Sequence, residues 1–315
     1  MTSEPPARAA GVAHAARGGI AYTIGAYLLW GALPLYFLAL VPTGPWEVVA
    51  WRVLLSFVFC CLLLTIMRGW PAFIAIVRQP RLLGWTALAG VLIYVNWQAF
   101  LIGTLTGHVI ETSLGYFINP IFTVLLGVFV LRERVRRLQW IAIGVAALAV
   151  VVIVIAYGAF PWIALTLTAS FGIYGLVKKQ IGAAVDATSG LTLESFWLIP
   201  IAVVTLIVVG QTDGITFGQV SPLHTLLVAG AGIATAVPLL LFAAGTRRID
   251  LSLVGMLQFI TPVMQFIVGW ALLGEPMPFE RWIGFIIVWI AIAVFVADLL
   301  LHGRRTRTAA PVDLV

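Results

Sequence analysis

The sequence predicts an all-α membrane protein in which ten transmembrane helices form two inverted five-helix repeats, with both termini in the cytoplasm. Three observations lead to this fold class: the composition, the spacing of the apolar segments and a motif that occurs twice. Of the 315 residues, 62% are hydrophobic and 10% are charged, and the mean hydropathy is +1.10. A soluble globule needs more polar surface than this. The natural partner of such a chain is a lipid bilayer.

Charge and cysteine content argue against several other classes of protein. The net charge is +6, but the basic residues form short clusters between apolar runs rather than a stripe, so no nucleic-acid partner is expected. The two cysteines, Cys60 and Cys61, are adjacent within an apolar run and lack the spacing of a disulfide framework or a metal site. We expect no metal and no cofactor, and nothing in the sequence indicates an oligomeric state.

Ten segments have the length and apolarity of a membrane helix, which needs about 20 residues. They divide the chain into a first repeat at 19–157 and a second at 160–301. Residues 1–18 are rich in Ala, Gly, Pro and Arg and predict a disordered tail, and residues 302–315 form a basic tail. The predicted spans are 19–41, 46–67, 82–103, 109–131, 138–156, 160–177, 191–210, 222–245, 251–273 and 280–301.

The distribution of basic residues orients these spans. Sixteen of the 18 fall in the two tails or in the connections after spans 2, 4, 6 and 8. Arg281 lies on the opposite side, and Arg52 lies within span 2. Because basic connections stay in the cytoplasm, both termini and these four connections are predicted to be cytoplasmic. We expect a multi-pass protein of the plasma membrane, which in a bacterium is the inner membrane.

The repeat is visible at an offset of 142 residues that needs no insertion or deletion. The matched pairs include Gly90 and Gly232, Phe100 and Phe242, Gly103 and Gly245, Phe117 and Phe259, Pro120 and Pro262, Gly127 and Gly269, Glu133 and Glu275, and Trp140 and Trp282. Five spans per repeat is an odd number, so the two halves are inverted in the bilayer. This architecture is typical of secondary transporters, which bind a small-molecule substrate near the midplane between the repeats.

Two proline motifs fall near the middle of their predicted spans. Asn119 and Pro120 lie about ten residues into span 4, and Thr261 and Pro262 lie at the same depth in span 9. A mid-helix proline frees a backbone carbonyl, which is tolerated only against protein or water. The functional interpretation is a pair of kinked helices facing a central cavity. The alternative is that both prolines only bend helices for packing.

Other polar, aromatic or proline residues fall at a similar depth. Each alone is readily explained as a contact between helices, but together they fit a pocket for a small organic molecule. The predicted cavity residues are Trp30, Pro34, Asn96, Trp97, Tyr116, Asn119, Pro120, Tyr174, Pro238, Gln258, Thr261 and Pro262.

Three charged residues are candidates for a gate or for ion coupling. Arg52 either pairs with Glu47 or Glu111, or snorkels outward, or holds an anionic substrate or an external gate. Glu111 stands at the start of span 4. Glu194, near the start of span 7, is first of all a candidate helix cap, with an inner gate or a proton carrier as alternatives. Glu133 and Glu275 at the ends of spans 4 and 9 are interpreted as structural anchors beside arginines.

Signals of catalysis are absent from the sequence. It contains no HExxH, GxSxG or P-loop motif, and its four histidines are scattered. We therefore predict no enzyme and no catalytic residue. The alternatives to a secondary transporter are a passive channel or facilitator and, less favoured, a membrane enzyme or assembly subunit.

Several motifs resemble those of the RarD group of EamA-type proteins in the drug/metabolite transporter superfamily, over about residues 18–300. They are Trp30-Gly31 with Pro34, Tyr36 and Phe37; Arg52; Asn96-Trp97; Glu111 with Ser113 through Pro120; Glu133-Arg134 with Gln139-Trp140; Tyr174 through Val177; Glu194 with Trp197 and Pro200; Val237 through Leu239; and Gln258-Phe259 with Pro262.

This resemblance implies two EamA repeats, ten helices and transport of small organic metabolites or drugs by alternating access. The RarD group is named for chloramphenicol sensitivity, so a chloramphenicol-related substrate is one expectation. Leu38, Trp51 and Thr261 depart from the group's pattern, which often has lysine, histidine and glycine at these positions.

Overall fold

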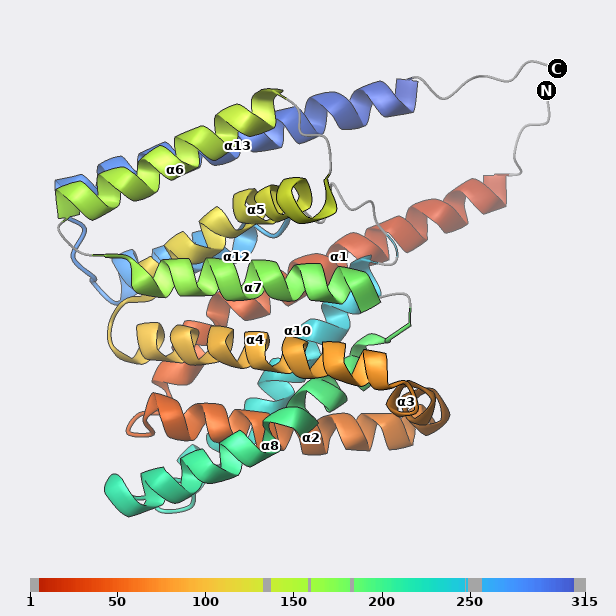
Figure 1. Ribbon diagram of the computed structural model, residues 1–315, viewed down its shortest axis with the longest axis vertical. Helices are drawn as coiled ribbons and strands as arrows, with labels where there is room; N and C mark the ends of the chain where they lie inside the picture. The colour runs from red at the N-terminus through yellow and green to blue at the C-terminus, as the bar shows by residue number, and fades with distance from the viewer. Residues whose placement is uncertain are drawn as a thin grey trace.

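The computed structural model of the protein describes residues 6–132, 137–157, 160–181, 184–246, 248 and 257–308. These residues form a helical bundle and contain no strand (Figure 1). The helices are α1 (Pro6–Leu38), α2 (Pro45–Ile66), α3 (Trp70–Val77), α4 (Pro80–Leu105), α5 (Val109–Leu131), α6 (Arg137–Tyr157), α7 (Trp162–Ile181), α8 (Ala187–Thr212), α9 (Pro222–Ala229), α10 (Ala231–Thr246), α12 (Ile260–Ile267), the π-helix η1 (Val268–Leu272) and α13 (Phe279–Thr308).

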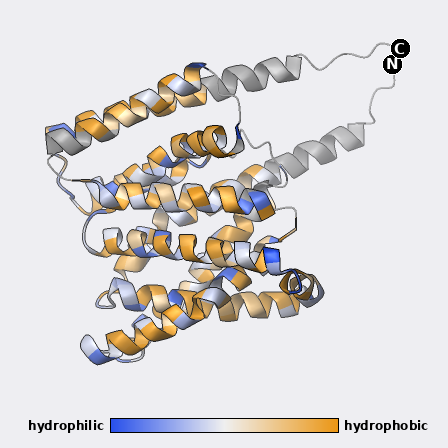
Figure 2. Cartoon of the chain, in the orientation of Figure 1, coloured by the Kyte–Doolittle hydropathy of each residue, from blue (hydrophilic) through white to orange (hydrophobic). Residues whose placement is uncertain are grey.

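The described helices have the length and surface of membrane-spanning elements. Seven are long and apolar enough to cross a bilayer, with α9 and α10 counted together, and three shorter apolar helices lie within α6, within α7 and across α12 and η1. Many large apolar side chains are exposed on outward faces, Phe129 and Leu226 among them, and Figure 2 shows hydrophobic residues along all the helices. Since exposed apolar side chains are favourable against lipid, the protein is a multi-pass membrane protein.

The structure differs from the sequence prediction at several boundaries. α1 begins at Pro6, so the backbone at residues 6–18 is helical where disorder was expected; the alanines there favour a helix. α13 likewise continues to Thr308 within the predicted tail. The short helix α3 was not predicted, because its eight residues are too few to span a membrane.

The helices pack in pairs that contain one member from each half of the chain. From top to bottom in Figure 1, α6 lies beside α13, α5 beside α12, and α8 beside α2 at the opposite end. Between these pairs, α4 packs on α7 and α8, while α10 packs on α1 and α2. Exchanging helices of the first half for helices of the second half, α1 for α7, α2 for α8, α4 for α10, α5 for α12 and α6 for α13, leaves this list of contacts unchanged.

Two glycines related by the 142-residue offset explain part of this symmetry. A Cβ atom at Gly90 would lie 3.0 Å from the carbonyl oxygen of Glu194 on α8. A Cβ atom at Gly232 would lie 2.5 Å from the carbonyl group of Leu55 on α2. Each glycine therefore allows one helix of its repeat to approach the backbone of the other repeat.

Glu275 joins the two repeats near one end of the bundle. Its carboxylate follows η1 and accepts hydrogen bonds from the backbone N–H groups of Val109 (2.6 Å) and Ile110 (2.9 Å), the first residues of α5. Burial raises the pKa of Glu275, and the two backbone donors and Arg281 oppose that shift. The predicted anchor role is therefore confirmed for Glu275, with backbone groups as its hydrogen-bond donors. Its counterpart Glu133 lies outside the described residues.

Candidate functional site

Arg52 lies seven residues after the first residue of α2 and is 4% exposed. Its guanidinium carbon lies 4.2 Å from the centre of the Trp97 ring and 5.3 Å from that of the Phe37 ring. Its Nε donates to the hydroxyl of Thr235, on α10, at 2.8 Å. The side chain thus points into the bundle between the two repeats. The expectation that it snorkels outward is wrong.

The expectation that Arg52 pairs with Glu47 or Glu111 is also wrong, because both carboxylates have backbone partners. Glu47 accepts hydrogen bonds from the N–H groups of Thr216 and Phe217, in the connection after α8. Glu111 accepts from the N–H groups at the start of α7, with Ile163 as the closer donor at 2.9 Å. A helix N-terminus stabilises a carboxylate in this way. Glu111 therefore acts in the structure as a helix cap.

Asn96 connects three helices near the middle of the bundle. Its Nδ2 donates to the carbonyl of Leu167 and to the hydroxyl of Ser170, both on α7, at 3.2 Å. The hydroxyl of Tyr116 on α5 donates to its Oδ1, also at 3.2 Å. The buried amide is thus partnered within the bundle, as the cost of an unpaired amide in hydrocarbon requires.

Glu194 forms a buried ion pair rather than a helix cap. Asp186 caps α8 by accepting from the N–H of Ser189, whereas Glu194 lies a further two turns along the helix and is 1% exposed. Its carboxylate accepts from Lys178 Nζ at 2.6 Å and from the Tyr174 hydroxyl at 3.1 Å. The capping interpretation is wrong, and the alternatives of an inner gate or a coupling group stay open.

A chain of aromatic rings connects the surroundings of Arg52 with those of Glu194. We call these rings the aromatic column. Neighbouring ring centres are 6.0 to 6.2 Å apart, which is ring-contact distance. The column consists of Phe37 on α1, Phe100 on α4, Tyr116 on α5, and Phe171 and Tyr174 on α7. It crosses from the first repeat to the second.

A second set of hydrogen bonds connects α12 with α1 and α5. The hydroxyl of Thr261 donates to the carbonyl of Tyr27 at 2.9 Å, and Gln265 Nε2 lies 3.4 Å from the carbonyl oxygen of Trp30. The hydroxyl of Ser113 on α5 donates to the carbonyl of Pro262 at 2.8 Å. In each contact a side chain of one helix bonds to the backbone of another, as expected of polar contacts between membrane helices.

The two prolines of the repeat are not in equivalent surroundings. Pro120 lies inside the continuous helix α5. Residues 258 and 259, by contrast, form a turn, and Pro262 falls in the first turn of α12. A proline in the first turn replaces an N–H that has no partner in the helix, so it requires no kink. In the predicted span 9 the described helix α12 therefore begins at Ile260, and the prediction of a helix kinked at Pro262 is wrong.

The other predicted cavity residues lie on α1, α5 and α10 and in the turn before α12. Pro34 and Pro238 are buried inside α1 and α10. Gln258 lies half-buried in the turn before α12. Asn119 is buried on α5, and its Oδ1 has no hydrogen-bond partner. Asn119 thus has an unused acceptor inside the bundle.

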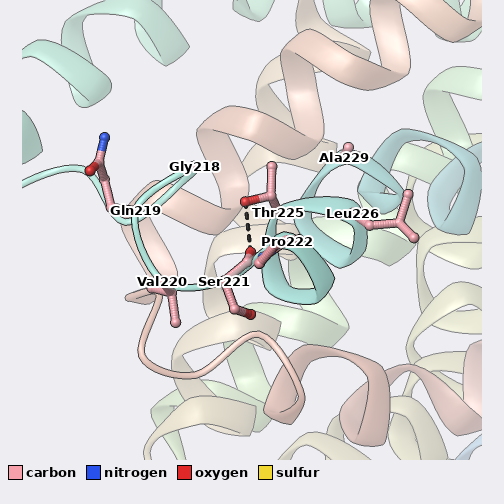
Figure 3. A pocket seen from close by; sticks show the side chains of 8 residues that line it. All are labelled: Gly218, Gln219, Val220, Ser221, Pro222, Thr225, Leu226 and Ala229. Carbon is pink, nitrogen blue, oxygen red and sulfur yellow. Dashed lines mark hydrogen bonds between the residues drawn. The ribbon is translucent and has the colours of Figure 1, made fainter.

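A pocket of about 710 Å³ is found elsewhere, on the connection between α8 and α10 (Figure 3). Its walls come from residues 218–221 and from four residues of α9, and they include none of the predicted cavity residues. The hydroxyl of Thr225 in this wall is already bonded to the carbonyl of Ser221. With few free polar groups, this pocket is a weaker candidate than the buried residues around Arg52.

Sequence reasoning missed two functional neighbours. Lys178 was assigned to a connection, but α7 continues to Ile181 and places it one turn after Tyr174. Thr235 was overlooked because it occurs in an apolar run. The 142-residue offset could have indicated this region, because it aligns Arg52 of span 2 with Glu194 of span 7. Two opposite charges at equivalent buried positions mark the site.

No group of three metal-binding side chains occurs within the part of the chain that the structure describes. The buried polar groups instead come from helices of both halves, and the aromatic column connects them. That arrangement suits recognition of an organic molecule.

Comparison with known proteins identifies the class. The model of the EamA-like transporter family matches residues 17–155 and again residues 160–297. The chain belongs to this family. Within it the chain is of the RarD type, which confirms the resemblance seen in the sequence.

Two relatives and one solved structure illustrate this similarity. Protein RarD of Streptomyces exfoliatus is 41% identical, with 95% of each chain covered. Protein RarD of Escherichia coli strain K12 is 37% identical, with 92% of this chain and 97% of the relative covered. A protein of known crystal structure shares the fold with a TM-score of 0.57 at 17% identity, over 88% of this chain and 96% of the other.

Proposed function

We propose that this membrane transporter is a secondary carrier of small organic metabolites or drugs that works by alternating access between its two repeats. In this proposal the ten predicted spans all cross the bilayer, the repeats are 19–157 and 160–301, and both termini are cytoplasmic. The substrate contacts lie among the predicted cavity residues.

The observation that carries the proposal is the exchange symmetry of the helix contacts. The main contacts between the two repeats come in exchanged pairs: α4 packs on α7 and α8, and its counterpart α10 packs on α1 and α2. Two inverted repeats can adopt each other's conformation, which opens the shared site to one side of the membrane and then to the other. The start of α12 at Ile260, directly after the turn at Gln258 and Phe259, adds a second supporting feature, because transporter sites often use helix ends within the membrane.

The hydrogen bonds at the helix ends support the inversion. Glu275 joins the end of η1 to the start of α5, and Glu111 joins the start of α5 to the start of α7. The starts of α5 and α7 therefore lie on the same side, which requires α7 to run parallel to α5. α7 is the first helix of the second repeat. A direction parallel to α5 is the one expected for it if the first repeat crosses the membrane five times.

The test is flux into liposomes that contain the purified protein. The panel holds amino acids, nucleobases and chloramphenicol, each with and without a pH gradient. We expect saturable uptake of at least one compound and trans-stimulation by the same compound on the far side. An Asn119→Ala variant, which loses the unused buried acceptor, should reduce the uptake, while an Arg81→Gln variant, at an exposed position in the first turn of α4, serves as the control.

Two results would contradict the proposal. Uptake that never saturates and shows no trans-stimulation indicates a passive channel. Absence of flux for every compound, together with a stable bound partner or with turnover in detergent, indicates an assembly subunit or an enzyme.

A further inference from the structure

Arg52 is a cation that the described fold does not neutralise. No acidic side chain of the described residues forms a salt bridge with it, and Glu47 and Glu111 are turned to backbone groups. The guanidinium is removed from water, as its 4% exposure shows. A buried charge without a counter-ion is costly, and contacts with aromatic rings offset only part of that cost. The fold thus holds a charge whose natural complement is an anion from outside.

One nitrogen of the guanidinium points to where that anion binds. Nε donates to Thr235, but Nη1 is fully buried and has no acceptor among the neighbouring groups. A buried N–H without an acceptor is rare in native proteins and is energetically unfavourable. Thr235 holds the planar group from the α10 side, so the orientation of Nη1 is set by the protein.

The walls around Arg52 indicate an organic ligand. The guanidinium lies between the rings of Trp97 and Phe37, and Phe37 begins the aromatic column. An inorganic anion needs polar groups on several sides, whereas an aromatic or aliphatic body is favourably buried against such rings.

The charge balance along the column indicates the number of negative charges. At the far end, the charge of Lys178 is cancelled by Glu194. Among the described residues along the column, Arg52 is therefore the one charged group without an opposite charge beside it. A ligand with one negative charge balances it, and a dianion would remain partly unpaired.

We propose that Arg52 binds the carboxylate of an organic monoanion whose apolar body lies against Trp97 and the aromatic column. This inference rests on the proposed transport function and specifies its substrate class. Nη1 donates to the carboxylate, while Thr235 keeps the guanidinium in place.

The structure is closed over this site at the Arg52 end of the bundle. Thr43 Oγ1 lies 2.7 Å from the hydroxyl of Thr216 and 2.9 Å from His224 Nε2. The rings of Trp51 and Phe217 are 4.6 Å apart. These contacts join the α1–α2 connection and the start of α2 to the segment between α8 and α9 and to the start of α9, so a ligand reaches Arg52 from this side only after they separate.

The experiment measures binding to the full-length protein in detergent by equilibrium dialysis. The probes are N-acetylphenylalanine, 4-hydroxyphenylacetate and indole-3-acetate, each compared with its neutral amide. The wild-type protein should bind at least one acid about tenfold or more tightly than its amide, because a hydrogen bond to a charged group is lost in the amide complex. Arg52→Gln should abolish this preference, Arg52→Lys should retain part of it, and the control Arg81→Gln should leave it unchanged.

Thermal unfolding of the same variants separates a binding role from a structural one. Because Arg52 carries an uncompensated charge, the ligand-free Arg52→Gln protein should unfold at the same temperature as the wild type or at a higher one. An arginine that only holds helices together through Trp97 gives the opposite result: a lower unfolding temperature and no change in the acid preference.

Several outcomes overturn the inference. It fails if no acid is bound more tightly than its amide by the wild-type protein, or if Arg52→Gln keeps the preference. If, in addition, a neutral compound still shows saturable flux in liposomes with Arg52→Gln, the transport function stands and only the substrate class is wrong. Absence of saturable flux for every acid and every neutral compound removes the proposed function itself.

Discussion

Arg52 and Glu194 occupy equivalent positions in the two repeats, yet the protein accommodates their charges in opposite ways. Each lies seven residues into its helix, α2 or α8, and each is almost fully buried. Glu194 has a lysine at 2.6 Å and a tyrosine hydroxyl at 3.1 Å. Arg52 has two aromatic rings and one threonine, and no carboxylate among the described residues.

The difference shows which features of the duplication were kept and which diverged. The backbone packing is shared, as Gly90 against α8 and Gly232 against α2 demonstrate. The side-chain chemistry at the two ends is not. At one end the buried charges are balanced within the described residues, and at the other we propose that a ligand supplies the missing charge. In this proposal similar helix packing supports two chemically different ends of one binding path.

The largest expected effect on stability comes from the paired end. Replacing Lys178 by methionine leaves the carboxylate of Glu194 buried without its cation, and loss of one partner from a buried pair costs about 3 kcal/mol or somewhat less where the lysine is partly exposed. We expect a fall of about 2 to 3 kcal/mol in the free energy of unfolding in detergent. The double variant Lys178→Met with Glu194→Gln should recover most of it. Equal stability of Lys178→Met and wild type would show that Glu194 is not ionised against Lys178.

The next effect tests the shared packing. Gly232→Ala places a methyl group 2.5 Å from backbone atoms of α2, whereas Gly90→Ala places it 3.0 Å from those of α8. Overpacking of this kind costs about 1 to 3 kcal/mol, so we expect about 2 for Gly232→Ala and about 1 for Gly90→Ala. Gly144→Ala, where no atom lies within 4 Å, is the matched control. A harmless Gly232→Ala would mean that the two repeats do not need this close approach.

A smaller effect is expected at the neighbour of Arg52. Thr235→Val keeps the shape of the side chain but removes the acceptor of Nε, and an unsatisfied buried donor costs about 1 kcal/mol. The loss should disappear in the Arg52→Gln background, because the donor is then absent. Additive losses in the double variant would separate Thr235 from Arg52.

The smallest effect concerns the two helix caps. Glu275→Gln weakens two charge-assisted bonds to the start of α5 and should cost about 1 kcal/mol, whereas the more exposed Glu111→Gln should cost about 0.5 kcal/mol at the start of α7. Both changes are measured by thermal unfolding in detergent. A larger loss for Glu111→Gln would indicate a role of this residue beyond capping.

The sequence was sufficient to predict the helical membrane class and the RarD resemblance, because apolar spans and a constant offset are properties of the chain itself. It was not sufficient for the partners of buried charges. The sequence offered Glu111 as a partner for Arg52. In the structure its carboxylate is bound instead by the free N–H groups at the start of α7. Such competition depends on where helices begin, and Glu194 was misinterpreted for the same reason.

The turn before α12 also could not be predicted from the sequence. Apolar residues stand on both sides of Gln258 and Phe259, so the hydropathy of this segment gives no sign of the turn. Lys178 was misplaced because a lysine normally ends a predicted span, whereas here Glu194 stabilises it within the last turns of α7.

The central claim is that the two ends of the bundle open in alternation. Distances between pairs of spin labels test it most directly, after Cys60 and Cys61 have been replaced by alanine. One pair, at Val41 and Val220, reports the Arg52 end, and a second, at Gln79 and Gln180, reports the Glu194 end; all four positions are exposed. We expect two populations of distances at each end, and addition of a transported compound should shift the two ends in opposite directions. A single unchanging distance at both ends, while saturable flux is present, would contradict alternating access.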